Sequence, residues 1–147
     1  MAFDLLSAEN KDEAYPLRYT DVDANSEHAH AIAYLDSYGL LTRFSQGGEN
    51  LDGNLFRPNE SITRAEFSML LHRLSFQTFP RFYGDVLENM EYGSWYFAYV
   101  NYAWRCGWLE LDENGDIRPD EPITAAEAAH ALSVVSEIGY PTPGVDF

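Results

Sequence analysis

Cysteine and long apolar runs are scarce in this sequence of 147 residues. Its single cysteine, Cys106, cannot form an internal disulfide, so the fold does not depend on one. No run of about 18 or more apolar residues is present, which argues against a membrane-spanning helix. The first ten residues lack a basic segment and include Asp4 and Glu9, so we expect no signal peptide here.

Positive charge is also scarce. Nine Lys and Arg residues oppose 24 Asp and Glu residues, which gives a formal net charge of −15. This balance argues against nucleic acid and anionic membrane surfaces as partners. All the basic residues except Lys11 are arginines, and arginine holds carboxylates and phosphates through a planar, two-pronged contact. The alternative explanation for this excess of arginine over lysine is a compositional bias of the source.

Apolar and aromatic residues are plentiful. They make up 46% and 15% of the chain, whereas disordered chains are poor in aromatics. A chain of this length is typical of one domain-sized fold with a hydrophobic core.

Two segments of the chain repeat each other. Residues 56–66 (FRPNESITRAE) align without a gap with residues 117–127 (IRPDEPITAAE). Upstream, residues 19–22 (YTDV) have a counterpart in residues 83–86 (YGDV). Each copy also has an apolar stretch that ends at a glycine, Gly39 in the first and Gly107 in the second. Three matched features in the same order indicate an internal repeat.

Each copy predicts a helix, a loop and a second helix. In the first copy the helix over Ala29 to Tyr38 stops at Gly39, a residue suited to a left-handed helix end. The second helix of each copy opens with a capping box, in which a Thr and a Glu three residues later satisfy free backbone N–H groups. The capping residues are Thr63 and Glu66, and Thr124 and Glu127. The predicted buried stripes are Phe67, Leu70, Leu71 and Leu74 in one copy, and Ala128, Ala131, Leu132 and Val135 in the other.

We therefore predict an all-α fold of tandem helix–loop–helix repeats, with one short β-contact near the loops. The predicted divisions are an N-terminal extension with a short helix (1–18), repeat 1 (19–80), repeat 2 (81–139) and an extended tail (140–147).

These landmarks together resemble the S-layer homology repeat, most closely in residues 62–67 (ITRAEF). The resemblance implies a compact, pseudo-symmetric helical bundle at the bacterial cell surface or cell wall, without catalytic activity or a cofactor. It implies that the module binds an anionic, pyruvylated secondary cell-wall polysaccharide. The glycan-binding positions that it implies are Arg64, Trp95, Asp21, Asp85, Gly39 and Gly107.

The sequence departs from the family pattern in both copies. Residues 27–29 (EHA) stand where the first copy should have a tryptophan, and Ala125 replaces the signature arginine in the second. Because neither copy carries both groups, we hypothesise a composite pocket of Arg64 and Trp95. The alternative is a protein–protein interaction or assembly scaffold in which glycan binding has been lost.

Other motifs indicate no metal site and no catalytic centre. Asp112, Asn114 and Asp116 resemble the start of a calcium loop, but Ile117 and Ile123 stand where that loop requires Gly and Glu. No nucleophile elbow or phosphate loop is present, and we expect Cys106 to be an inert, buried thiol.

The segment from Tyr92 to Trp108 has eight aromatics in seventeen positions. Treated as one helix, it is apolar on more than one side. We therefore expect a homodimer partner, a neighbouring domain or the N-terminal residues Phe3 to Leu6 to cover it, unless it is an ordinary core helix.

Overall fold

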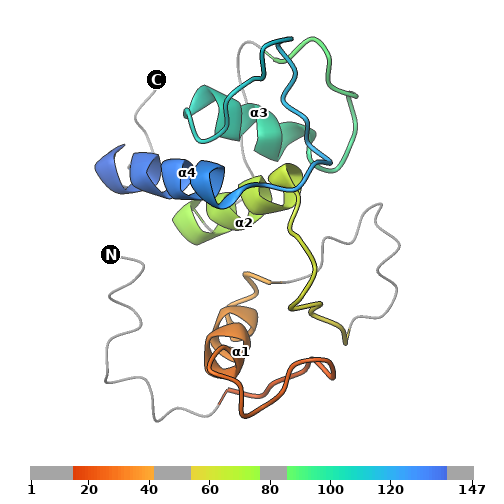
Figure 1. Cartoon of the computed structure of the whole chain (residues 1–147), viewed down its shortest axis with the longest axis vertical. Helices are drawn as coiled ribbons and strands as arrows, with labels where there is room; N and C mark the ends of the chain where they lie inside the picture. Colours follow the sequence, from red (N-terminus) through yellow and green to blue (C-terminus); the bar gives the residue numbers. More distant parts are fainter. Residues whose placement is uncertain (1–14, 42–53, 77–85, 139–147) are drawn as a thin grey trace. The chain divides into compact units, whose positions relative to one another are not determined.

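The computed structural model describes residues 15–41, 54–76 and 86–138 of the chain (Figure 1). These residues form four helices: α1 (Ala29–Ser37), α2 (Arg64–Phe76), α3 (Phe97–Arg105) and α4 (Ala125–Ile138). The described residues contain no strand, only an isolated antiparallel bridge between Thr63 and Pro122. The predicted all-α fold is confirmed, and the bridge is the predicted short β-contact.

The chain divides into two compact units, Met1–Glu60 and Ser61–Phe147, which we call the N-terminal and C-terminal units. Helix α1 belongs to the N-terminal unit, whereas α2, α3 and α4 belong to the C-terminal unit. The second helix of the predicted repeat 1 is thus grouped with repeat 2. The repeat boundaries stay a prediction, and both the helix expected before Ala14 and the tail 140–147 lie outside the described residues.

The N-terminal unit has a small core beside α1. Tyr19, Val22, Ala29 and Ile32 are buried there. The carboxylate of Asp36, in the last turn of α1, accepts hydrogen bonds from the Arg18 guanidinium and from the Tyr19 hydroxyl, at 2.9 Å. Burial alone would raise the pKa of Asp36, but these two donors lower it, so the carboxylate stays charged at neutral pH. Helix α1 ends at Gly39, whose φ of 71° is the left-handed end that the sequence predicts.

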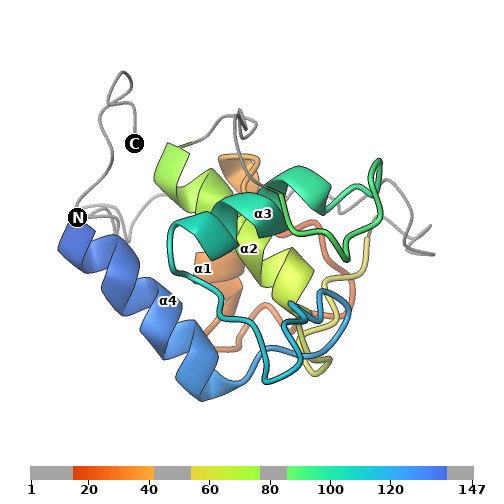
Figure 2. The same cartoon turned by 90° about the horizontal axis from the view of Figure 1, so that it is seen from above.

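The core of the C-terminal unit lies between α2 and α3, which pack against each other and cross in Figure 2 (Figures 1 and 2). Its buried residues are Ala65, Leu71, Val100, Ala103, Trp108, Leu109, Ile117 and Ala131. The last of these is on α4, which also packs Val134 and Val135 against the cluster.

A line of polar residues on α2 is buried, which the sequence does not predict. Arg64, Ser68 and His72, spaced four apart, are each at most 2% exposed. Ser68 donates to the Arg64 carbonyl oxygen at 2.8 Å. His72 meets the rings of Tyr99 and Tyr102 edge-on, at centroid distances of 5.6 and 4.9 Å.

The predicted apolar stripes are only partly correct. On α2, Leu71 is buried, but Phe67, Leu70 and Leu74 are only half-buried. On α4, Ala131 is buried, whereas Leu132 is 38% exposed. On both helices the buried face therefore differs from the stripe that was predicted from the apolar residues alone. On α2 the polar residues find hydrogen-bonding or aromatic partners inside the unit.

The predicted aromatic helix from Tyr92 to Trp108 is too long, since α3 covers only Phe97–Arg105. Gly93 and Gly107 flank it with φ of +96° and +72°, backbone angles that a helix does not contain. Tyr92 is exposed in the preceding turn, but Trp108, 4% exposed, turns back into the core. Because α3 is shorter than predicted and Trp108 is buried, this segment exposes less apolar surface than the sequence predicts. A dimer partner or neighbouring domain on this segment stays a prediction.

Both capping boxes are confirmed. In each, the Glu backbone N–H donates to the Thr hydroxyl, at 3.1 Å for Glu66 and 3.2 Å for Glu127. The Thr backbone N–H donates back to the Glu carboxylate at 2.8 Å in both copies. The turns before these helices also repeat, because Arg57 and Arg118 both have left-handed backbones, with φ of 60° and 51°.

The buried histidine predicts a pH-dependent stability. Burial, aided by the nearby charge of Arg73, lowers the pKa of His72 to about 4, from its ordinary 6.5. Between these values the unfolded chain binds the proton more tightly, so the free energy of unfolding falls as pH drops from about 6.5 towards about 4. The full loss is of the order of 3 kcal/mol. Chemical denaturation at a series of pH values measures it.

The His72→Phe variant is the control, because phenylalanine fits between the two tyrosine rings but does not titrate. Carboxylates contribute to the pH dependence of both proteins, so the difference between them isolates His72. Identical pH profiles for the wild type and the variant would contradict the prediction.

Candidate functional site

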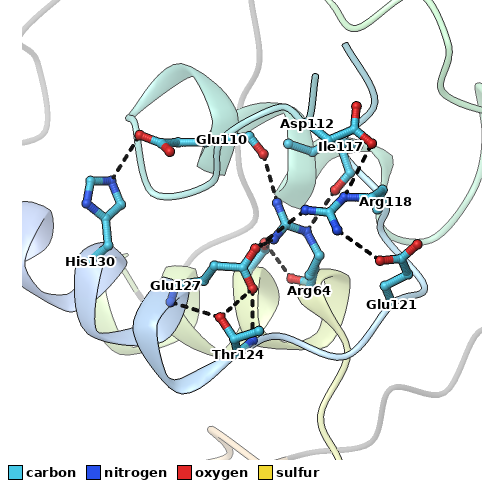
Figure 3. A network of polar contacts seen from close by, with 10 residues as sticks. Arg64, Glu110, Asp112, Ile117, Arg118, Glu121, Thr124, Glu127 and His130 are labelled. Carbon is cyan, nitrogen blue, oxygen red and sulfur yellow. Dashed lines mark hydrogen bonds and ion pairs between the residues drawn. The ribbon is translucent and has the colours of Figure 1, made fainter. Parts of the chain in front are cut away.

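A network of polar contacts in the C-terminal unit centres on Arg64, the first residue of α2 (Figure 3). The Arg64 side chain is 1% exposed. Its Nε donates to the carbonyl oxygen of Ile117 at 2.8 Å, and its Nη2 donates to that of Glu110 at 2.9 Å. Its Nη1 donates to the carboxylate of Glu127, on α4. One guanidinium therefore joins α2, the segment 110–117 and α4.

Glu127 is shared between two arginines and its own helix cap. Its Oε1 accepts from Arg64 and lies 3.6 Å from Nη2 of Arg118. Its Oε2 accepts from the backbone N–H and the hydroxyl of Thr124, at 2.8 and 2.9 Å. Burial alone would raise the pKa of Glu127, but the Thr124 and Arg64 donors lower it. The carboxylate is thus held in its charged form at neutral pH.

Arg118 is surrounded by carboxylates. Its Nη1 donates to Glu121 at 3.0 Å, and its Nε lies 3.7 Å from Oδ2 of Asp112. Within the described part of the chain, that buried Nε has no hydrogen-bond acceptor. The Asp112 carboxylate itself accepts the backbone N–H groups of Asn114 and Asp116, at 2.8 and 2.9 Å. The calcium-like spacing noted in the sequence therefore forms a backbone turn.

A half-open cavity of about 570 Å³ lies beside this cluster. Its walls are the segments 86–91 and 114–119, together with the side chains of Tyr96 and Trp104. Asn89 from the first segment donates to the Asp116 carboxylate of the second at 3.3 Å. Neither Arg64 nor Trp95 lines this cavity.

Besides Arg64, three of the predicted glycan-binding positions fall within the C-terminal unit. Trp95 is half-buried against the core and meets the Tyr96 ring edge-on, at a centroid distance of 5.4 Å. Gly107 has a left-handed φ, and its carbonyl oxygen lies 3.0 Å from Nε2 of His130. Asp85 lies outside the described residues.

The other predicted positions belong to the N-terminal unit. Asp21 accepts the backbone N–H groups of Phe56 and Arg57, at 2.8 and 2.6 Å. Burial would raise the pKa of Asp21, but these bonds lower it. Asp21 thus fixes the turn at Arg57, and Gly39 ends α1. A glycan-binding role for these residues stays a prediction.

The sequence does not show that the residues lining the cavity come together. Asn89 belongs to no motif, and Tyr96 and Trp104 are distinguished only as members of the aromatic segment Tyr92 to Trp108. These segments meet only in the folded unit. Among the cavity residues, Arg118 can be picked out from the sequence, because its Arg-Pro pair repeats the pair at Arg57.

Cys106 is half-buried, not fully buried as the sequence predicts, and burial raises the pKa of its thiol. Within the described ranges, no helix is long and apolar enough to cross a membrane, and no group of three potential metal-ligating side chains occurs.

The fold and its contacts define an all-α module with repeated capping and turn geometry. Comparison with protein families matches residues 18–68 to the S-layer homology domain, a span that contains α1 and the start of α2. The match supports an S-layer homology domain in this part of the chain, and such a domain indicates association with the cell wall or cell surface in general. No curated protein is significantly similar to the chain.

The geometry of Glu127 predicts a stability effect. Glu127→Gln leaves the buried Arg64 charge without its carboxylate, and should lower the free energy of unfolding by about 2 kcal/mol. Glu121→Gln removes an exposed partner of Arg118 and should cost less than about 1 kcal/mol. Urea denaturation of the two variants measures the difference, and equal costs would contradict a special role for the Arg64–Glu127 pair.

Proposed function

We propose that this chain is a non-catalytic module that holds its parent protein on an anionic, pyruvylated cell-wall polysaccharide. The observation that carries the proposal is the S-layer homology match at residues 18–68. The family places such modules at the cell surface, and the first copy retains the complete signature segment from Ile62 to Phe67.

Within this proposal Arg64 acts as a positioning residue. Its side chain is buried, so a sugar cannot reach the guanidinium in this arrangement of the unit. It instead holds the carbonyls of Glu110 and Ile117 and the carboxylate of Glu127 in fixed places. A glycan would contact groups that this network orients.

The burial of Arg64 also favours a second candidate, an assembly scaffold without glycan binding. If the signature arginine serves only to join segments of the C-terminal unit, its presence carries no information about a ligand. The second copy has Ala125 at the equivalent position and therefore lacks the arginine.

Retention on cell walls separates the two candidates. We expect the purified chain to sediment with bacterial walls that keep their secondary polymer, and to stay in solution once that polymer has been removed. Equal retention in both samples, or none in either, would contradict the anchoring function. Added salt should relieve the repulsion between the net charge of −15 and an anionic polymer, but it should also weaken a local ion pair with the polymer. Because these two effects oppose each other, we expect retention to change only slightly with salt.

The hypothesis of a composite site, in which Arg64 positions the groups that a sugar contacts and Trp95 contributes ring surface, predicts coupled effects on binding. Arg64→Lys loses the planar fork and should weaken affinity for a pyruvylated sugar roughly tenfold, and Trp95→Ala should weaken it by removing a ring contact. If both act on one site, the double variant should lose less affinity than the sum of the two. Calorimetric titration measures this, with thermal unfolding to verify that each variant is folded. Additive losses, or an unchanged affinity in Arg64→Lys, would contradict a shared site.

A further inference from the structure

The cavity beside Arg118 is formed by parts of the chain that the sequence motifs do not connect. Asn89 and Asp116, from its two walls, are joined by a hydrogen bond of 3.3 Å. Its volume of about 570 Å³ lies within the range of small-molecule sites. The cavity lies entirely in the C-terminal unit.

The lining of this cavity combines flat apolar surface with hydrogen-bonding groups. Tyr96 and Trp104 provide aromatic surface, and both are half-buried, so they are only partly open to solvent. Asn89, Asn114 and Asp116 provide amides and a carboxylate, and all three are exposed. Aromatic rings cover the C–H faces of a sugar ring, while amides and carboxylates bind its hydroxyl groups.

The charges around the cavity disfavour an anion. Glu88, Glu91 and Asp116 line it with negative charge, and Arg118 is its one basic lining residue. That guanidinium already faces three carboxylates, those of Asp112, Glu121 and Glu127, within 4 Å. A negatively charged ligand would therefore meet more repulsion than attraction here.

We propose that this cavity binds an uncharged sugar residue, with its ring against Tyr96 and Trp104 and its hydroxyls on Asn89 and Asp116. The proposal rests on the proposed function only in naming the cell-wall polymer as the source of the sugar. In such a polymer, the uncharged residue enters the cavity and the acidic substituents stay in solvent.

Titration of the full chain with single sugars, followed by NMR, tests the ligand class. The probes are N-acetylglucosamine (uncharged), glucosamine (cationic) and glucuronate (anionic). N-acetylglucosamine should shift the indole N–H signal of Trp104, while those of Trp95 and Trp108, which do not line the cavity, stay in place. An equal or larger shift of the Trp104 signal with glucuronate would overturn the proposal. So would a shift with glucosamine alone, or no shift with any of the three.

Two variants test the site. Asn89→Ala removes a polar group from the wall and should weaken N-acetylglucosamine binding at least fivefold. Glu113→Gln changes an exposed residue of the neighbouring turn that does not line the cavity, and should leave binding unchanged. The same loss in both variants, or in neither, would contradict the assignment.

Wall retention distinguishes this inference from the proposed function. Retention on the polymer without a Trp104 shift would remove the cavity as a sugar site and leave anchoring in place. A Trp104 shift without retention would contradict the anchoring function, and would leave a sugar-binding cavity whose natural sugar does not come from the cell-wall polymer.

Discussion

The guanidinium of Arg64 lies inside the C-terminal unit and binds two carbonyl oxygens and a carboxylate. Burying a charged group is costly unless it is paired and hydrogen-bonded, and here both conditions are met. The acceptors come from residues 46, 53 and 63 positions further along the chain. This single side chain therefore fixes the start of α2 against the turn at Ile117 and the start of α4. The cavity lies beside that turn, so its geometry depends on the same contact.

The local part of the structure was predictable from sequence because its causes are local. A Thr and a Glu three residues apart start α2 and α4, and a glycine ends α1, since each needs only the neighbouring backbone. The extent of α3 was not predictable from its aromatic content, because Gly93 and Gly107 redirect the chain at either side. The role of Arg64 was equally hidden. The family resemblance made it a glycan-binding position, and only the fold shows acceptors converging on it.

The two copies of the repeat share the same structure in the turns at Arg57 and Arg118. Arg57 and Arg118 share a left-handed backbone, and each forms an ion pair with a Glu three residues later. Such a backbone angle is unfavourable for a residue other than glycine, so other contacts have to maintain it. In the first copy the Asp21 carboxylate does so by accepting the N–H of Arg57. In the first copy, the Asp and Arg-Pro landmarks of the sequence are thus explained by one local structure.

The ion pairs of Arg64 and Arg118 leave little free positive charge on these two residues for a ligand. Arg64 and Arg118 both direct their charge to Glu127, and Arg118 also to Glu121 and Asp112. Their positive charge is therefore largely neutralised within the unit, in a chain whose net charge is −15. Recognition that relied on long-range attraction of an anion would have to overcome this field. Hydrogen bonds and ring contacts act at short range and are little affected by it. A polymer with both charged and uncharged sugars can be held through its uncharged residues, because its acidic groups then keep their hydration.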